Sequence, residues 1–328
     1  MFSSILRSIV FYRRINIVVA LAVAISTAVI GGAMIVGDSV RYSLRQMTRQ
    51  RLGDVTHVVH GRFVREDLAS EVARHSGARV APAILVTAGM ELQRDDSVRR
   101  AGSVSVTAVD SAAWSFFDTA ERSAPVGQDI VLGFRTAGEL DAQVGDTISM
   151  WVELPTSIPR DSLLGEREDV SAEIQLTVSD ILPEDAGASR FTLNPGQQLP
   201  WNAFVSLPAM QERLGLEARE KSRRNPIARP ATVNTLLIHQ EDAETGAGDG
   251  LSEAVRAVLS LDDLAVRLRT DSERGYVSVE SDRMILEQAV SDGVVAAADQ
   301  LGLRSAPTLV YLMNELAAAD RTSSDERY

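Results

Sequence analysis

The sequence predicts an α+β protein that is held in a membrane by one N-terminal transmembrane helix. Three observations support this prediction. Residues 15–36 contain no charged side chain. Runs rich in β-branched residues, several alternating at period two as half-buried strands do, recur from residue 55 to residue 280. Helical patterns lie between these runs without strict alternation, which argues against a doubly wound parallel sheet.

The uncharged run 15–36 (INIVVALAVAISTAVIGGAMIV) is predicted to span the membrane. About 20 apolar residues are enough for a helix to cross a hydrocarbon core of roughly 30 Å. A cleavable signal peptide has an apolar region of only about 7–15 residues, followed by small residues at the cleavage site. Here the triplet Ala20-Leu21-Ala22 lies inside the run. We therefore expect a retained signal-anchor after a cytoplasmic stub at 1–14, with a signal peptide and a buried core helix as the alternatives.

The orientation of this span is not decided by the arginines alone, because they flank it on both sides. The stub 1–14 contains no acid, and a long acidic domain follows the span. Long domains are translocated largely regardless of their charge. We therefore expect the N-terminus in the cytoplasm and the main domain outside it, in a single-pass arrangement, since no comparable apolar run follows residue 36.

The span is predicted to continue as an amphipathic stalk helix over residues 37–53. Gly53 is a natural C-terminal cap. A helix from about Arg13 to Leu52 would be about 60 Å long, with roughly half of it beyond the bilayer. Apolar residues recur at helical spacing on one face of the stalk and arginines on another, namely Val40, Leu44 and Met47 against Arg41, Arg45 and Arg49.

The remainder of the chain is predicted to mix strands and short helices. The motif Val144-Gly145-Asp146-Thr147 indicates a tight turn before a strand. Strands are predicted at 55–60, 84–92, 103–109, 146–154, 172–181, 203–207, 233–239 and 275–280. Helices are predicted at 65–76, 136–142, 208–215, 250–259 and 281–302, and polar joints at 217–231 and 240–250.

The charge balance and the rare residue types exclude several functions. The chain has 45 acidic and 33 basic residues and a formal charge of −12, which argues against nucleic acid and against an anionic lipid surface as partners. Lys221 is the single lysine and follows Glu220, so a P-loop cannot occur. Cysteine is absent, which excludes disulfides, thiolate zinc sites and a cysteine nucleophile. We expect no cofactor and no bound metal.

The candidate catalytic residues are better explained by structural roles. His57 and His60 would share a face on a helix, but the β-branched residues around them predict a strand, on which they point apart. The sequence contains neither a G-x-S-x-G nor an H-E-x-x-H motif. A Ser-Lys dyad would have to use Lys221. The acidic pairs are expected in turns, where carboxylates bind backbone amides: Asp95-Asp96, Glu184-Asp185 and Asp262-Asp263.

Two proline-containing loops are candidate partner-binding surfaces. They are LPTSIPRDSLLG at 154–165 and LNPGQQLPWNAFVSL at 193–207. In the second loop, Trp201 and Phe204 are better interpreted as buried aromatic anchors.

The order of these segments resembles the permease subunits of bacterial ABC systems of the MacB/FtsX/LolC type. The similarity extends from about residue 5 to about residue 316 and includes GDSVRYSLRQMTRQRLG, VGDTI, LPTSIPRDSLLG, LNPGQQLPWNAFVSL and VESDRMILEQAV. The resemblance implies a two-lobed, MacB-like periplasmic core domain over 54–302, with an inserted β-rich lobe at about 113–232, on the bacterial inner membrane. Residues 303–328 would form a C-terminal helix and a disordered tail.

The resemblance also implies the partners of the chain. A separate ABC ATPase subunit would drive it, a second permease copy would complete a dimer, and motion would pass along the stalk to the periplasmic domain. No catalytic residue is implied. The stalk residues that match the family are Gly37, Asp38, Ser39, Arg41 and Leu44.

The family continues into further FtsX-like membrane helices, whereas this sequence stops at ADRTSSDERY. We therefore expect a truncated or frameshifted product, or else a single-pass relative that pairs with another permease subunit. An anchored or secreted extracytoplasmic hydrolase is the alternative function. An anchored sensor is disfavoured, because the stub 1–14 leaves no room for a signalling domain.

Overall fold

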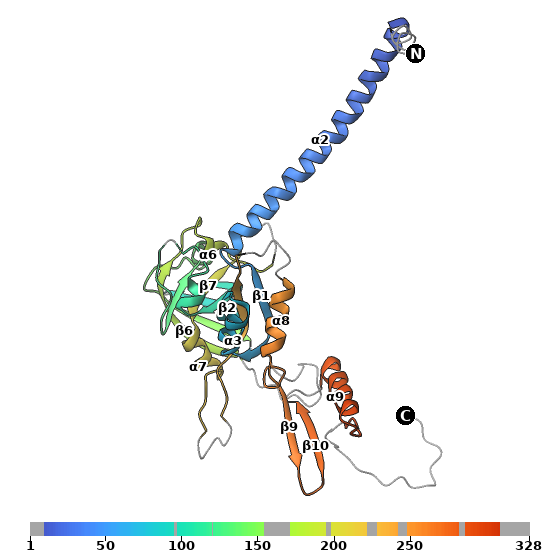
Figure 1. The fold of residues 1–328 in the computed structure, drawn as a ribbon. Helices are drawn as coiled ribbons and strands as arrows, with labels where there is room; N and C mark the ends of the chain where they lie inside the picture. Colours follow the sequence, from blue (N-terminus) through green and yellow to red (C-terminus); the bar gives the residue numbers. More distant parts are fainter. Residues whose placement is uncertain are drawn as a thin grey trace, which may run out of the picture. The chain divides into compact units, whose positions relative to one another are not determined.

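The computed structural model is a mixed α/β protein with a long N-terminal apolar helix and a β-rich core (Figure 1). The predicted fold class is therefore confirmed. Two compact units are present, Met1–Leu264 and Ala265–Tyr328. The residues that the structure describes are 10–94, 97–119, 121–153, 171–194, 198–221, 228–241, 248–281 and 286–308.

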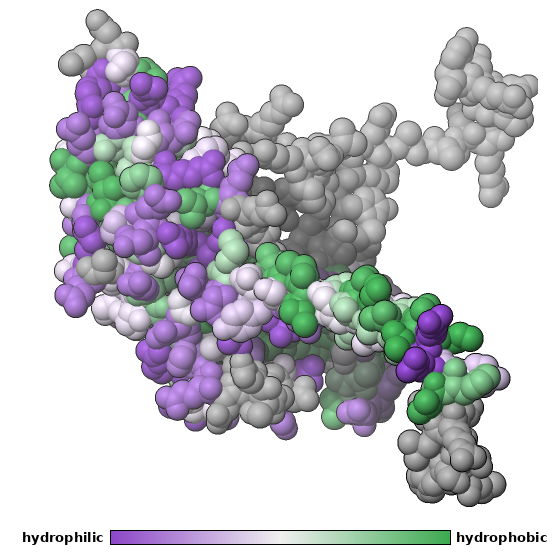
Figure 2. All heavy atoms as spheres, turned by 90° about the horizontal axis from the view of Figure 1, so that it is seen from above, coloured by the Kyte–Doolittle hydropathy of each residue, from purple (hydrophilic) through white to green (hydrophobic). Residues whose placement is uncertain are grey.

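Helix α2, Arg13–Leu52, is one uninterrupted helix of 40 residues with the bounds that the sequence predicts. Its large apolar side chains between residues 15 and 36 are exposed, at 55–71% of their full area. Within the described part of the chain, α2 is the one helix long and apolar enough to cross a membrane. Figure 2 shows apolar side chains gathered along this helix, while polar side chains dominate the surface of the domain. An apolar helix surface without protein cover is what a lipid-facing span requires.

Eight strands form one sheet in the order β1-β8-β2-β3-β7-β4-β6-β5. Strand β2 also pairs with β5, so six of the strands form a closed ring, and β8 and β1 extend the sheet from β2. The pairs β3–β7 and β4–β6 are parallel, and the others are antiparallel. The strands are β1 His57–Arg65, β2 Arg79–Arg94, β3 Ser97–Val109, β4 Asp129–Leu132, β5 Thr147–Glu153, β6 Ser171–Ile181, β7 Asn202–Ser206 and β8 Thr232–His239.

The closed ring combines strands from inside and outside the segment 113–232, which the resemblance predicts to be an inserted lobe. Strands β4 to β7 belong to that segment, and they share the ring with β2 and β3. The domain boundaries given above stay predictions.

The alternation of apolar residues places one buried cluster inside the ring. Ile148, Met150 and Val152 alternate along β5, and Ile174 and Leu176 alternate along the neighbouring β6; all five are at most 4% exposed. Side chains at every second position of a strand share one face, so a closed ring directs one set inward. The packing of this interior is expected to supply much of the stability of the domain.

Met150 tests the importance of this interior. Met150→Ala removes a fully buried side chain and is expected to lower the free energy of unfolding by about 2–5 kcal/mol. Urea unfolding of the full chain in detergent, followed by tryptophan fluorescence, measures the change. The control Val126→Ala alters a side chain that is 67% exposed and should change the free energy by less than about 0.5 kcal/mol. Equal effects of the two variants would contradict this account of the core.

Short helices accompany the sheet in the first unit. The predicted helix 136–142 is observed two residues earlier, because Asp141 takes a left-handed conformation with φ 53° and ends it. The bounds are α3 Leu68–Ser76, α4 Ser111–Trp114, α5 Phe134–Leu140, α6 Gly187–Arg190, α7 Leu207–Leu214 and α8 Gly248–Val258.

The second unit contains the hairpin β9 Val266–Asp271 and β10 Tyr276–Ser281, and the helix α9 Gln288–Gln300. The predicted helix 281–302 therefore starts too early, since Ser281 is the last residue of β10. Strand β9 was not predicted, although apolar residues alternate with arginines in Val266-Arg267-Leu268-Arg269. Several predictions fall outside the described residues: the loop 154–165, Asp95-Asp96, the centres of both polar joints and the tail from 309.

Candidate functional site

The stalk residues that match the family all lie on α2. Gly37, Asp38, Ser39, Arg41 and Leu44 are exposed there, and Leu44 retains 54% of its area. A Cβ atom built on Gly37 would meet nothing within 4 Å. Their coupling role stays a prediction, and the structure adds a second site, where α2 ends on the domain. We call this site the helix–domain joint and define it as residues 51–56 with their contacts.

The joint begins where α2 becomes buried. Arg51 is 8% exposed, and Leu52 packs against a second buried cluster, which lies apart from the cluster inside the ring. This second cluster includes Trp114, Phe117 and Phe204. Gly53 then ends the helix with φ 61° and ψ −134°. A Cβ atom on Gly53 would lie 2.5 Å from the backbone oxygen of Phe116. Only glycine fits here, because both the dihedral angles and the close approach exclude a side chain.

Backbone hydrogen bonds fix the next residues to two separate parts of the domain. The Asp54 N–H donates to the oxygen of Phe116 at 2.9 Å. The Thr56 N–H donates to the oxygen of Ile238 at 2.9 Å, and the Thr56 hydroxyl donates to the same oxygen at 3.1 Å. The ring Nδ1 of His239 donates to the backbone oxygen of Asp54 at 2.6 Å. The chain leaving α2 is thus held by the segment after α4 and by β8.

An exposed ion pair completes the joint. Arg79 Nη2 lies 3.0 Å from Asp54 Oδ2, and the Arg79 guanidinium lies 5.0 Å from the centre of the Phe116 ring. Both charged side chains are more than half exposed. Pairs of this kind contribute only about 0–1 kcal/mol. The joint therefore depends mainly on its buried and backbone contacts.

Aromatic side chains fill the core beneath the joint. The ring of Phe117 lies 4.6 Å from that of Phe191 and 5.5 Å from that of Phe204, and Trp114 lies 5.2 Å from Phe204. All four are at most 6% exposed. Rings at these separations attract one another beyond the burial of their area. Phe204 is thus a buried anchor, as predicted, whereas Trp201 is only partly buried, against the core of the ring.

Asn202 supports this aromatic cluster from β7. Its side-chain Nδ2 lies within hydrogen-bond distance of the backbone oxygens of Ala188, Ser189 and Phe191, at 3.1, 3.3 and 2.8 Å. Asn202 is 2% exposed. These contacts fix α6, which itself contacts α2. Helix α2 therefore ends against α6, whose backbone is held in place by the buried side-chain amide of Asn202.

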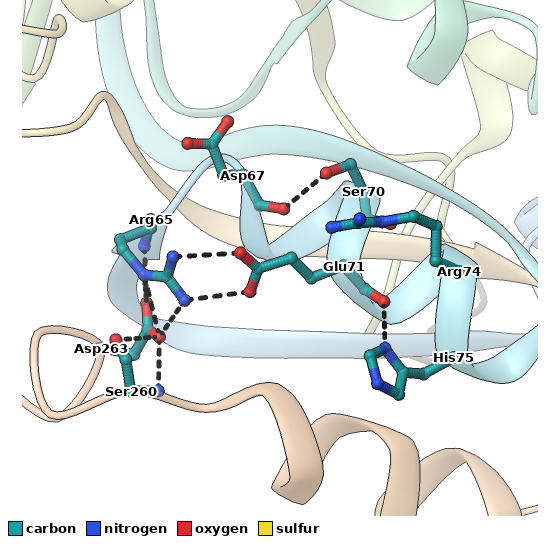
Figure 3. A network of polar contacts seen from close by, with 8 residues as sticks. All are labelled: Arg65, Asp67, Ser70, Glu71, Arg74, His75, Ser260 and Asp263. Carbon is teal, nitrogen blue, oxygen red and sulfur yellow. Dashed lines mark hydrogen bonds and ion pairs between the residues drawn. The ribbon is translucent and has the colours of Figure 1, made fainter.

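A second polar site, the Arg65 network, fixes the end of the first unit (Figure 3). Asp263 is 1% exposed and accepts hydrogen bonds from the backbone N–H of Arg65 at 2.9 Å and from that of Ser260 at 3.0 Å. The Arg65 guanidinium binds Asp263 at 3.0 Å and Glu71 at 3.1 Å. The network joins β1, α3 and the segment after α8.

The network also shifts the pKa values of its members. Burial alone would raise the pKa of Asp263, but hydrogen bonds from Arg65 and from the Ser260 backbone outweigh it, and the net pKa is lowered. Hydrogen bonds to Asp263 and Glu71 raise the pKa of Arg65. Both groups are therefore ionised at neutral pH. The Arg65 network is therefore a stabilising contact, and neither Asp263 nor Arg65 changes its protonation state near neutral pH.

Among the residues that the structure describes, the histidines form no catalytic pair. His60 Nδ1 lies 2.8 Å from the Thr235 hydroxyl, but Thr235 is fully buried and donates to Asn234 Oδ1 at 3.0 Å. His75 Nδ1 donates to the backbone oxygen of Glu71 at 3.0 Å. His57 Nδ1 lies 3.1 Å from the Thr56 hydroxyl, which binds Ile238. Each hydroxyl next to a histidine thus bonds an amide or carbonyl oxygen, and Thr235 is inaccessible to a substrate.

A surface hollow is lined by Gln128, Glu173, Gln175 and Arg213. These side chains are exposed and include no nucleophile beside a base. No group of three or more metal-ligating residues occurs in the described part of the chain. The alternative function, a hydrolase, requires convergent titratable groups in a pocket, and this hollow does not provide them.

Sequence reasoning identified Gly53 as a helix cap but missed the contacts that make it part of a joint. Phe116, Arg79 and His239 lie far from it along the chain. The sequence signal was the pair Gly53-Asp54 directly after a long helix. Their partners depend on the tertiary fold.

No protein-family model matches this sequence, and no curated protein matches it. A solved structure with a similar fold is the periplasmic region of MacB from Actinobacillus actinomycetemcomitans. It is 8% identical, with a TM-score of 0.36 over 74% of this chain and 84% of that chain. This is a remote likeness of fold, and it assigns no function.

Proposed function

We propose that the chain is the membrane-anchored periplasmic part of an ABC-type permease, in which α2 couples the β-rich domain to movements produced by a separate ATPase subunit. A second permease copy would pair with it. The observation that supports this proposal is the continuity of α2, whose exposed apolar surface runs without a break into a helix that ends in the joint. The sequence resemblance to permeases of the MacB/FtsX/LolC type points the same way.

Coupling of this kind needs a stiff helix and a stiff attachment. Neither proline nor a chain break interrupts α2, and its backbone hydrogen bonds run along the whole length. At the joint, Gly53 and the hydrogen bonds of Asp54 and Thr56 fix the exit of the chain. A tilt or shift of the helix in the bilayer would therefore move the domain, with no need for a substrate channel through this subunit.

A topology experiment tests the location that this function needs. The full chain is fused at its C-terminus to alkaline phosphatase, which is active only outside the cytoplasm, or to a fluorescent protein that matures only in the cytoplasm. We expect active phosphatase and a dark fluorescent protein, with the fusion resistant to extraction by alkaline carbonate. Deletion of residues 15–36 is the control and should reverse both signals. A fluorescent full chain with inactive phosphatase would contradict the proposal.

A further inference from the structure

We propose that Arg41 and Arg45 bind the phosphodiester groups of anionic membrane lipids where α2 leaves the bilayer. The site rests on the proposed function only in requiring α2 to span a membrane. Neither the orientation of the span nor the ATPase enters the argument.

The position of the two arginines along α2 is the first support. Val36 is the last residue of the uncharged run. At 1.5 Å per residue, Arg41 and Arg45 lie about 7.5 and 13.5 Å beyond it. Headgroups add roughly 5–8 Å to each side of the hydrocarbon core. Side chains on a helix lean toward its N-terminus, which here is the direction of the bilayer, so both guanidinium groups can reach the phosphates.

The second support is that these cations have no partner in the part of the chain that the structure describes. Arg41 and Arg45 are exposed and make neither an ion pair nor a hydrogen bond through their side chains there. Arg49, on the same face, has a partner and is not included in the site. Many arginines of the domain, by contrast, are paired with carboxylates: Arg65, Arg79, Arg94, Arg100, Arg122 and Arg219.

The local charge explains why an acidic protein can bind an anionic lipid. The chain carries a charge of −12 overall, but the stalk 37–52 contains four arginines and one acid, Asp38. Screening limits the field of the remote domain to about 8 Å at physiological ionic strength. Arg41 and Arg45 are four residues apart and therefore neighbours on one face. Guanidinium groups bind phosphate oxygens in a bidentate manner, which favours arginine at such a site.

Local lipid enrichment around the stalk tests the site. Because the chain contains no cysteine, Ser43→Cys provides one labelling position for a donor dye on α2. The full chain is placed in phosphatidylcholine nanodiscs that contain acyl-labelled phosphatidylglycerol or, separately, acyl-labelled phosphatidylcholine. We expect energy transfer to report about fivefold enrichment of phosphatidylglycerol. The double variant Arg41→Gln/Arg45→Gln should bring the enrichment of phosphatidylglycerol over phosphatidylcholine close to one. High salt should lower this enrichment in the unsubstituted chain.

The control is Arg99→Gln/Arg213→Gln, which removes the same charge from exposed residues of the domain and should leave the enrichment unchanged. Three results would each overturn the inference: no enrichment in the unsubstituted chain, enrichment that survives loss of Arg41 and Arg45, or an equal decrease in the control. Enrichment that survives would leave the arginines available for an acidic partner protein. A chain that fails to enter nanodiscs would instead contradict the proposed function.

Discussion

Replacing Gly53 by alanine is expected to lower the free energy of unfolding by about 2–4 kcal/mol, because the change combines a strained backbone with a steric clash. The added Cβ would lie 2.5 Å from the oxygen of Phe116, and φ at this position is 61°. Relief of the clash requires the helix to move away from the segment after α4, which breaks the hydrogen bond from the Asp54 N–H to Phe116. Urea unfolding of the full chain in detergent, followed by tryptophan fluorescence, measures the loss.

Gly37→Ala is the matched control for this variant. Gly37 lies in the same helix, and its Cβ would meet nothing within 4 Å. Alanine is favoured over glycine inside a helix by about 0.8–1.0 kcal/mol, so this variant should be at least as stable as the unsubstituted chain. If Gly53→Ala were as stable as Gly37→Ala, the joint would not have the close contact described above.

The second large effect is expected for Asp263→Asn, which should cost about 3 kcal/mol at neutral pH, since loss of one partner from a buried ion pair typically costs about 3–5 kcal/mol. The lower end applies because Arg65 keeps its bond to Glu71. The asparagine amide would preserve the shape of the side chain but would leave the partly buried guanidinium of Arg65 without its closest anion. The difference in the free energy of unfolding between the two chains measures this contribution.

The pH dependence of that difference follows from the lowered pKa of Asp263. In the unfolded chain an aspartate has a pKa of about 3.9. The folded value is lower, so the stabilisation is fully present above the unfolded pKa and is lost as pH falls through the folded pKa. The difference between the chains should therefore stay constant from pH 7 to about pH 5 and shrink below about pH 4.

The neighbouring variant Asp262→Asn is the control for both measurements. Asp262 is exposed, whereas Asp263 is 1% exposed. Its substitution should change the free energy of unfolding by less than about 0.5 kcal/mol. Similar losses for the two neighbours, or a difference that grows in acid, would show that the Arg65 network does not stabilise the fold as described.

Features set by neighbouring residues could be predicted from the sequence. The bounds of α2 follow from an uncharged run, a helical pattern and Gly53 as a cap. Strand β5, Thr147–Glu153, follows from alternation after a glycine turn, and Gly145 indeed has φ 98°. Strand β4, Asp129–Leu132, was missed because four residues buried almost throughout have no alternation to reveal them.

Features that depend on distant residues could not be predicted. The ring closes because Met90 of β2 pairs with Met150 of β5, and no local pattern encodes that pairing. Asp263 was expected to bind backbone amides in a turn, and it does, but its main partner Arg65 lies 198 residues away. The same limit applies to position 53, where glycine is required because the backbone of Phe116 approaches it closely.

We expect α2 and the β-rich domain to move as one body through the joint. Nitroxide labels at Gln46 on α2 and at Glu139 on α5, both exposed, allow the distance between them to be measured in nanodiscs by pulsed electron paramagnetic resonance. We expect one narrow distance distribution for the unsubstituted chain and a broad one after Gly53→Ala. A broad distribution in the unsubstituted chain would contradict rigid coupling of the helix to the domain.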